Sequence, residues 1–376
     1  MRYLEKDIKE DLGRKMVFVG GPRQVGKTTL AKDILAESYP KGRYINWDFD
    51  DDRHGIIARK WQRSNDLLVF DELHKFPRWK SWLKGIYDVL GSDHYFLVTG
   101  SARLDVYKRG GDSLLGRYHY WRLHPFCLGE YPGSLHAEDV LERLLTFGGF
   151  PEPFLAGDER FARRWRRERF DRVLREDVRD LESIRNVQNL ALFVDLLRRR
   201  VGSLITISNL ASDIQVSPKT AKAWLELVER MYLAFAVLPY TEKLPRAVLK
   251  PPKVYFFDNG DVIGDDGARF ENLVASHLLK RLQYLEDRDG YRYELRFVRD
   301  KEGREVDFVV VKEGVVDELI EAKWTDDAIS SPLRYYNKKL RPRKCTQIVR
   351  TLLRPYDKDG ISVTDPVSYF RDGLFR

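Results

Sequence analysis

A short segment near the N-terminus combines glycines, a lysine and threonines in a spacing that suits phosphate binding. Gly21 and Gly26 are separated by four residues, and Lys27 and Thr28 follow directly. Glycines let backbone N–H groups curve around phosphate oxygens, and the positive end of a following helix faces the same oxygens. Lys27 would contact the β- and γ-phosphates, and the Thr28 hydroxyl would ligate Mg²⁺. We therefore expect an ATP site made of consecutive residues: Gly21, Pro22, Arg23, Gln24, Val25, Gly26, Lys27, Thr28 and Thr29.

An acidic pair after an apolar run supplies the second part of such a site. Residues 67–70 are Leu-Leu-Val-Phe, and Asp71 and Glu72 follow them. Asp71 would hold the magnesium ion through water, and Glu72 would act as the base that polarises the attacking water. A nucleotide-binding switch does not need Glu72, so its presence indicates hydrolysis.

Polar and basic residues further along the chain are candidates for the remaining catalytic roles. Thr99 and Ser101 follow the apolar run 95–98, and either could orient the attacking water. Arg117 is the candidate for the cation that neutralises charge on the γ-phosphate, with Arg103 as the second choice and a surface arginine without catalytic role as the alternative. An Arg117 that acts from a neighbouring subunit would require a homo-oligomer.

The elements that must position these residues follow an alternating order. Apolar runs at 16–19, 43–47, 67–70 and 95–98 predict buried strands, and helical patterns occupy 27–38 and 79–90. Such alternation is typical of an α/β fold with a parallel sheet and helices on both faces.

Carboxylates and a lysine near the C-terminus form a second candidate site. Glu271 lies on a predicted helix over 268–285, Asp307 lies on a predicted strand, and Glu321 and Lys323 share one face of the next strand. Converging carboxylates need a cation, and Mg²⁺ or Mn²⁺ would fit oxygen ligands. The arrangement resembles the PD-(D/E)xK nuclease motif, although Val306 stands where proline is common. In that motif Glu271, Asp307 and Glu321 would be the metal ligands and Lys323 the catalytic lysine; the alternative is an ion network without turnover.

The middle of the chain has the pattern of a winged helix-turn-helix. Short helices near 204–211 and from Pro218 to about residue 232 precede strand-like runs at 234–238 and 253–257. The second helix could contact DNA, or the segment could serve only for packing between domains. The arginines of 163–169 could follow a phosphate backbone, but we expect them to pair with acids at 171, 176, 177, 180 and 182 instead.

The composition of the chain limits its class of structure and its partners. The chain has 376 residues, 43% hydrophobic and 33% charged, with a net charge of +8. This balance excludes wholesale disorder and mildly favours a polyanionic partner such as DNA. The two cysteines cannot build a disulfide framework, and no run is long enough to span a bilayer. We expect a cytoplasmic protein without a membrane partner.

The segments GPRQVGKTT, VFDE, VTGSAR, LLGRY and GGFPEP together resemble a family of bacterial and archaeal ATPases of the AAA+ superfamily. The resemblance implies an AAA+ P-loop core at 1–135, a helical lid or linker at 136–200, a winged helix at 201–257 and a restriction-endonuclease-like domain at 258–376. The resulting hypothesis is a Mg²⁺-dependent ATP hydrolase coupled to a DNA-binding, metal-dependent nuclease-like domain. The alternative is an ATP-gated module for binding DNA or protein, with an inert nuclease-like domain.

Overall fold

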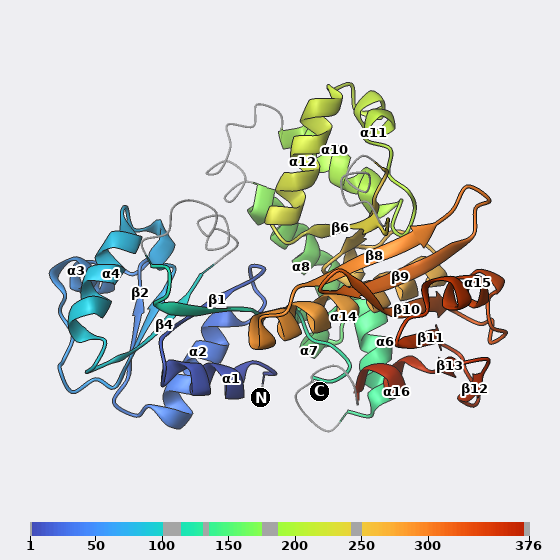
Figure 1. Ribbon diagram of the computed structural model, residues 1–376. Helices are drawn as coiled ribbons and strands as arrows, with labels where there is room; N and C mark the ends of the chain where they lie inside the picture. The colour runs from blue at the N-terminus through green and yellow to red at the C-terminus, as the bar shows by residue number, and fades with distance from the viewer. Residues whose placement is uncertain (1, 101–113, 131–134, 175–186, 242–249, 372–376) are drawn as a thin grey trace. The chain divides into compact units, whose positions relative to one another are not determined.

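A computed structural model describes residues 2–100, 114–130, 135–174, 187–241 and 250–371 (Figure 1). The chain divides into two compact units, Met1–His124 and Pro125–Arg376. In the described residues, no helix has the length and apolar character needed to cross a membrane.

A parallel sheet forms the centre of the N-terminal unit. Its strands have the order β2-β3-β4-β1-β5, and every neighbouring pair is parallel. The bounds are β1 Met16–Gly20, β2 Arg43–Asn46, β3 Leu67–Asp71, β4 Tyr95–Thr99 and β5 Tyr118–Arg122. The predicted parallel α/β sheet is therefore confirmed, and β5 is a strand that the sequence analysis did not predict.

Helices cover both faces of this sheet, as predicted. In Figure 1, α1 (Glu5–Leu12) and α2 (Lys27–Ser38) lie on one face, and α3 (Asp50–Ala58) and α4 (Trp79–Leu90) lie on the other. Alternate strand residues point to opposite faces, so Phe18, Phe70 and Phe96 join one core with Leu83 and Ile86 of α4. The short helix η1 (Leu73–Lys75) follows β3.

The strand order explains how distant parts of the sequence meet. β4 lies between β1 and β3, and Thr99 pairs in register with Asp71 on one side and Val19 on the other. The carboxyl ends of parallel strands share one edge of the sheet. The loop after β1, the acid at the end of β3 and the threonine at the end of β4 are therefore neighbours.

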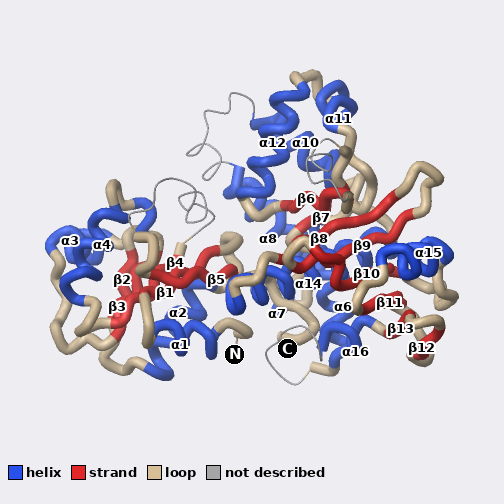
Figure 2. The backbone as a smooth tube through the Cα atoms, viewed as in Figure 1, coloured by secondary structure: helices blue, strands red, loops and turns tan. Residues whose placement is uncertain are grey.

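The C-terminal unit contains a mixed sheet of the order β12-β13-β11-β10-β9-β8-β6-β7 (Figure 2). Its strands are β6 Ala234–Pro239, β7 Lys253–Phe256, β8 Tyr293–Arg299, β9 Glu305–Lys312, β10 Val315–Lys323, β11 Lys344–Val349, β12 Tyr356–Lys358 and β13 Ile361–Thr364. The central strands β9 and β10 form an antiparallel hairpin, which turns at Glu313 and Gly314.

The two strands predicted as a wing belong to this sheet. β6 and β7 pair antiparallel, and β6 also pairs parallel with β8. The helices before them are α10 Val187–Arg198, α11 Ile207–Asp213 and α12 Pro218–Arg230. The division of the chain into four domains remains a prediction.

The other helices of this unit surround the sheet. They are α6 Ala137–Phe147, α7 Pro151–Ala156, α8 Glu159–Arg172, α14 Asp266–Asp289, α15 Ser331–Leu340 and α16 Pro366–Arg371, with the short helix η4 at Asn259–Asp261. Asp265 caps the start of α14, and its carboxylate accepts a hydrogen bond from the Ala268 N–H. The long apolar face of α14 is buried, as its sequence pattern indicated.

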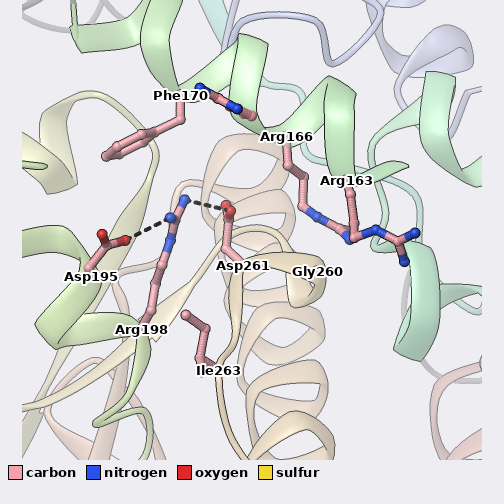
Figure 3. A pocket seen from close by; sticks show the side chains of 9 residues that line it. Arg163, Arg166, Phe170, Asp195, Arg198, Gly260, Asp261 and Ile263 are labelled. Carbon is pink, nitrogen blue, oxygen red and sulfur yellow. Dashed lines mark hydrogen bonds and ion pairs between the residues drawn. The ribbon is translucent and has the colours of Figure 1, made fainter. Parts of the chain in front are cut away.

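A buried ion network joins α8, α10 and η4. One carboxylate oxygen of Asp261 contacts Arg198 at 2.9 Å (Figure 3). Its other oxygen contacts Arg169 at 3.3 Å. Arg169 therefore pairs across the fold with Asp261, and not along its own helix as expected. Of the acids expected to pair with the arginine cluster, those at 176, 177, 180 and 182 lie outside the described residues.

Candidate functional site

The loop after β1 needs glycine at two positions. Gly21 has a φ of 134°, and a Cβ there would overlap the Leu123 carbonyl oxygen. Gly26 has a φ of 97° and directly precedes α2. Both conformations disfavour other residues, so these glycines set the curve of the loop and the start of the helix.

Lys27 lies inside this curve. Its side chain is buried, and its ammonium donates hydrogen bonds to the carbonyl oxygens of Gly21 at 3.0 Å and Pro22 at 2.6 Å. The loop thus holds a positive charge where backbone N–H groups and the N-terminus of α2 also gather. This is the arrangement that phosphate binding requires.

Asp71 is the centre of a hydroxyl cluster beside the loop. Thr28 donates to its Oδ2 at 2.7 Å, and Thr99 donates to its Oδ1 at 2.6 Å. A carboxylate next to a threonine hydroxyl supplies the hard oxygen ligands that suit Mg²⁺, so the residues present fit the predicted ion. Thr99, one of two candidates, lies in this cluster; Ser101 and Arg103 lie outside the described residues.

Tyr44 is a member of this cluster that the sequence analysis missed. Its hydroxyl donates to Asp71 Oδ2 at 2.6 Å from the neighbouring strand β2. Tyr44 can be assigned to the site only once β2 is known to pair with β3, because this pairing places residue 44 near the end of β3. The strand order is a tertiary property, so the sequence carried no local signal for Tyr44.

Glu72 follows Asp71 at the same edge of the sheet. Its backbone has a left-handed φ of 56°, and its carboxylate lies 3.2 Å from the Lys75 ammonium. Burial raises the pKa of Glu72, and this effect exceeds the opposing effect of Lys75. A raised pKa makes the carboxylate a better proton acceptor near neutral pH.

Arg117 lies far from the phosphate-binding loop (P-loop, residues 21–28) of its own chain. Its guanidinium makes two contacts with Asp88, at 2.7 and 3.3 Å. Its carbonyl oxygen accepts from the N–H of Met16, the first residue of β1, whereas the P-loop follows the last residue of that strand. A strand of five residues is about 16 Å long, so Arg117 lies at the opposite edge of the sheet.

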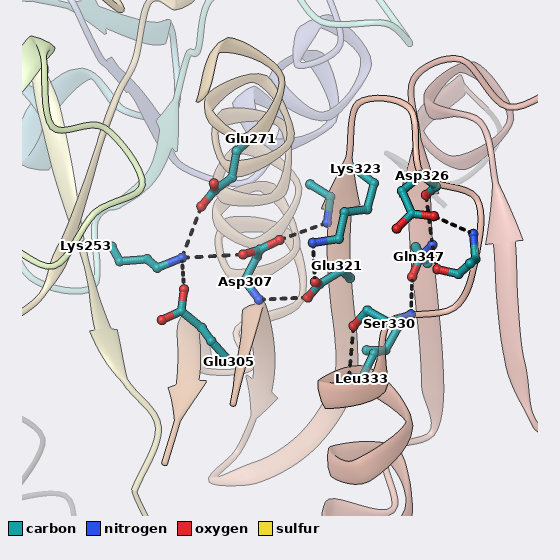
Figure 4. Close-up of polar contacts among 12 residues, drawn as sticks. Lys253, Glu271, Glu305, Asp307, Glu321, Lys323, Asp326, Ser330, Leu333 and Gln347 are labelled. Atoms are coloured by element: carbon teal, nitrogen blue, oxygen red, sulfur yellow. Dashed lines mark hydrogen bonds and ion pairs between the residues drawn. The ribbon is translucent and has the colours of Figure 1, made fainter. Parts of the chain in front are cut away.

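The four residues predicted at the C-terminal site lie close together (Figure 4). The Lys323 ammonium lies 2.8 Å from Glu321, and the Asp307 N–H donates to Glu321 at 3.4 Å. Asp307 also accepts a hydrogen bond from the Ala322 N–H at 3.0 Å. Burial and the neighbouring Asp307 carboxylate raise the pKa of both Glu271 and Glu321.

A second lysine, Lys253 on β7, enters the same cluster and was not predicted. Its ammonium lies 2.6 Å from Glu305, 3.2 Å from Glu271 and 3.5 Å from Asp307, and its side chain is only 2% exposed. Burial alone would lower the pKa of Lys253, but the surrounding carboxylates outweigh burial and raise it. Lys253 was assigned only to a strand, because nothing in the sequence shows that its side chain reaches Glu305 and Asp307 of β9.

At this second site the carboxylates contact lysines. No group of three or more aspartate, glutamate, histidine or cysteine side chains in the described segments is arranged to hold a metal ion. The Lys253 ammonium contacts both Glu271 and Asp307, and Glu321 pairs with Lys323. The Mg²⁺ or Mn²⁺ ion expected at Glu271, Asp307 and Glu321 remains a prediction.

Three family models match consecutive parts of the chain. Residues 13–132 match one described as an AAA domain. The N-terminal segment is therefore similar to AAA domains. Residues 138–262 and 266–369 match two that are described as domains of unknown function, DUF8612 and DUF4143.

Similar proteins come from archaea and bacteria. The chain is 24% identical over 349 residues to uncharacterized protein MJ1544 of Methanocaldococcus jannaschii, covering 83% of this chain and 76% of that protein. It is 24% identical over 246 residues to uncharacterized protein Rv2008c of Mycobacterium tuberculosis, covering 65% of this chain and 54% of that protein. The alignment thus spans about half the length of the mycobacterial relative.

Two solved structures have low overall similarity to the chain. The Aeropyrum pernix ORC1 protein in complex with DNA gives a TM-score of 0.34 at 13% identity, covering 75% of this chain and 94% of that one. Thermotoga maritima RuvB gives 0.31 at 15% identity, covering 62% and 88%. Similarity at this level does not bear on function.

Proposed function

We propose that the protein is a Mg²⁺-dependent ATP hydrolase whose C-terminal unit binds DNA. One observation carries the hydrolase assignment: the Thr28 hydroxyl and the Asp71 carboxylate lie 2.7 Å apart beside the buried Lys27. A cation, a metal-binding hydroxyl and an acid are the parts that P-loop phosphoryl transfer uses.

Different residues of the N-terminal unit would bind the phosphates, hold the metal ion and accept the proton. Backbone N–H groups of the loop and Lys27 would bind the phosphates, and Thr28 and Asp71 would hold magnesium. When bound, Mg²⁺ offsets negative charge on the β- and γ-phosphate oxygens. Glu72 would accept a proton from the attacking water, and Thr99 would keep the Asp71 carboxylate oriented through its hydrogen bond.

The rate of ATP hydrolysis by the Lys27→Met variant tests this assignment. Removing the ammonium should lower the rate of ATP hydrolysis by at least about 100-fold, because one donor to developing phosphate charge is removed. Lys41→Met, at an exposed lysine of the same unit, is the matched control and should hydrolyse ATP at the wild-type rate. Equal rates for wild type and Lys27→Met would contradict the proposed active site.

The DNA-binding part of the proposal rests on charge and on α12. The chain has a net charge of +8, and Lys219 and Lys222 are exposed on α12. Ser217 caps this helix by accepting from the Thr220 N–H at 3.0 Å, and Pro218 is its first residue. A firmly capped helix with exposed cations is suited to a winged-helix contact with DNA.

A specific observation favours the second candidate function, in which the nuclease-like domain is inert. Lys253 already compensates the carboxylates that a catalytic metal would need. Incubation of the protein with single-stranded and duplex DNA in Mg²⁺ or Mn²⁺ separates the candidates. We expect no cleavage; cleavage that Asp307→Ala abolishes would instead establish the metal-dependent nuclease predicted from the motif.

A further inference from the structure

The arginine-rich helix α8 borders a pocket that neither the ATP site nor the carboxylate cluster uses. The pocket has a volume of about 280 Å³ and lies where α8, α10 and the turn at η4 meet (Figure 3). Its charged lining consists of four arginines and two aspartates: Arg163, Arg166, Arg167, Arg198, Asp195 and Asp261. The lining therefore has an excess of positive charge.

Both aspartates of the pocket form ion pairs with arginines. Asp261 is buried, and its two oxygens contact Arg198 and Arg169. Asp195 contacts Arg198 at 3.0 Å. The Arg198 guanidinium also lies 4.6 Å from the centre of the Phe170 ring. These contacts hold Arg198 in a fixed position, and both aspartates already pair with Arg198 or Arg169 and not with the α8 arginines that line the pocket.

Among the described residues, the three arginines of α8 that line the pocket have no comparable partner. Arg163 contacts Glu159 at 3.0 Å, but both side chains are more than 60% exposed, and such pairs contribute little. Arg166 donates a long hydrogen bond of 3.4 Å to the Phe147 carbonyl oxygen. Within the described ranges, neither Arg166 nor Arg167 has a carboxylate at ion-pair distance.

Glycine at position 260 lets Arg166 reach the pocket. A Cβ at Gly260 would overlap the Arg166 guanidinium, so a larger residue would displace the arginine. The packing places the Arg166 guanidinium against the wall of the pocket, where the buried Asp258 carboxylate acts on it through space and no described carboxylate forms an ion pair with it. An anionic ligand would complete this arrangement, because the guanidinium fork matches phosphate oxygens in geometry and charge.

We propose that this pocket binds the phosphodiester backbone of DNA. The inference deepens the proposed DNA-binding function and rests on it. Arg163 and Arg167 are one helical turn apart, about 6 Å along the axis, so the row can contact successive phosphates of an extended strand. The half-buried Phe170 and the exposed Ile263 supply an apolar flank for sugars or bases. A row of arginines at an open pocket fits an extended polyanion better than a single small ion.

Binding of labelled DNA to the full chain at several salt concentrations tests the proposal. The pocket variant carries Arg163→Gln, Arg166→Gln and Arg167→Gln together. The control variant carries Arg292→Gln, Arg343→Gln and Arg354→Gln, which removes the same charge from exposed positions elsewhere in the C-terminal unit. Two DNA strands of unrelated sequence should be compared, because removing backbone-binding arginines weakens the binding of both equally.

The pocket variant should bind both strands at least about tenfold more weakly than wild type, with a salt dependence whose slope falls by about 0.7–0.9 for each phosphate that is no longer neutralised. The control variant should change the Kd less than about twofold. Arg167→Gln alone leaves the packing at Gly260 intact and should lower the slope by the amount due to one phosphate, so misfolding cannot produce the result. Equal weakening in both triple variants, or weakening for one sequence only, would overturn the inference. Wild type that binds neither strand would overturn the proposed DNA-binding function itself.

Discussion

The Tyr44 hydroxyl lies 2.6 Å from the same Asp71 oxygen that Thr28 contacts at 2.7 Å. Two hydroxyl donors, one on a strand and one on a helix, therefore converge on one carboxylate oxygen. Asp71 is only 4% exposed, so its orientation is fixed by these donors together with Thr99 and not by solvent. An acid held this way is already oriented before magnesium binds.

Tyr44→Phe should weaken magnesium binding without removing any predicted ligand. Loss of a group that orients a ligand typically costs about 10-fold in metal affinity, so the Mg²⁺ concentration for half-maximal ATP hydrolysis should rise by about that factor. Tyr95→Phe, at an exposed tyrosine of β4, is the control. An unchanged Mg²⁺ dependence in Tyr44→Phe would show that Tyr44 does not support Asp71.

Arg117→Ala tests whether this arginine acts within its own chain. The residue pairs with Asp88 at the edge of the sheet opposite the P-loop. A monomeric preparation, verified by sedimentation, should therefore hydrolyse ATP at the same rate with and without the substitution. Slower hydrolysis by monomeric Arg117→Ala would contradict the assignment of Arg117 to the far edge. A loss confined to assembled protein would instead support action on a neighbouring subunit.

The parts of the site that the sequence revealed are those encoded locally. Gly21, Gly26 and Lys27 lie in one turn, and Asp71 directly ends a strand, so periodicity and spacing were enough to predict them. Tyr44 and Lys253 were missed because their roles depend on tertiary structure: Tyr44 on the pairing of β2 with β3, and Lys253 on the contact of its side chain with Asp307 of β9. The strand β5 was missed because aromatic and polar residues alternate in Tyr118–Arg122 without a continuous apolar run.

Lys253→Met should strongly destabilise the C-terminal unit. The substitution leaves Glu271, Glu305 and Asp307 without their shared cation, and breaking a buried ion network by removing one partner costs about 3–5 kcal/mol. The free energy of unfolding in urea at neutral pH measures this loss. Lys344→Met, at an exposed lysine of β11, should change stability by less than about 0.5 kcal/mol.

A background in which two of the three carboxylates are neutral shows whether electrostatics causes the loss. Adding Glu271→Gln and Asp307→Asn to Lys253→Met removes two of the uncompensated carboxylates and should recover part of the stability. If the triple variant is no more stable than Lys253→Met, the packing of the lysine stem, and not its charge, accounts for the effect.

The environment of His277 predicts a specific pH dependence of stability. Its Nε2 accepts a hydrogen bond from the Leu128 N–H at 3.1 Å, and its Nδ1 lies 2.8 Å from the Leu273 carbonyl oxygen. The neutral ring with a proton on Nδ1 satisfies both contacts, whereas a proton on Nε2 would abolish the first. Burial and the nearby Lys280 ammonium lower the pKa of His277 to about 3.

The unfolded chain therefore takes up a proton near pH 6.5 that the folded protein does not bind until about pH 3. Titration of His277 therefore leaves the free energy of unfolding unchanged above pH 6.5. Below pH 6.5 it lowers the free energy of unfolding by about 1.4 kcal/mol for each pH unit, down to about pH 3. His277→Gln keeps an acceptor for the Leu128 N–H but cannot titrate, so its free energy of unfolding should fall less steeply between pH 6.5 and pH 5, by about 2 kcal/mol in total. His136→Gln, at an exposed histidine, should retain the wild-type slope. Identical slopes for wild type and His277→Gln would show that His277 is protonated in the folded protein as readily as in the unfolded chain.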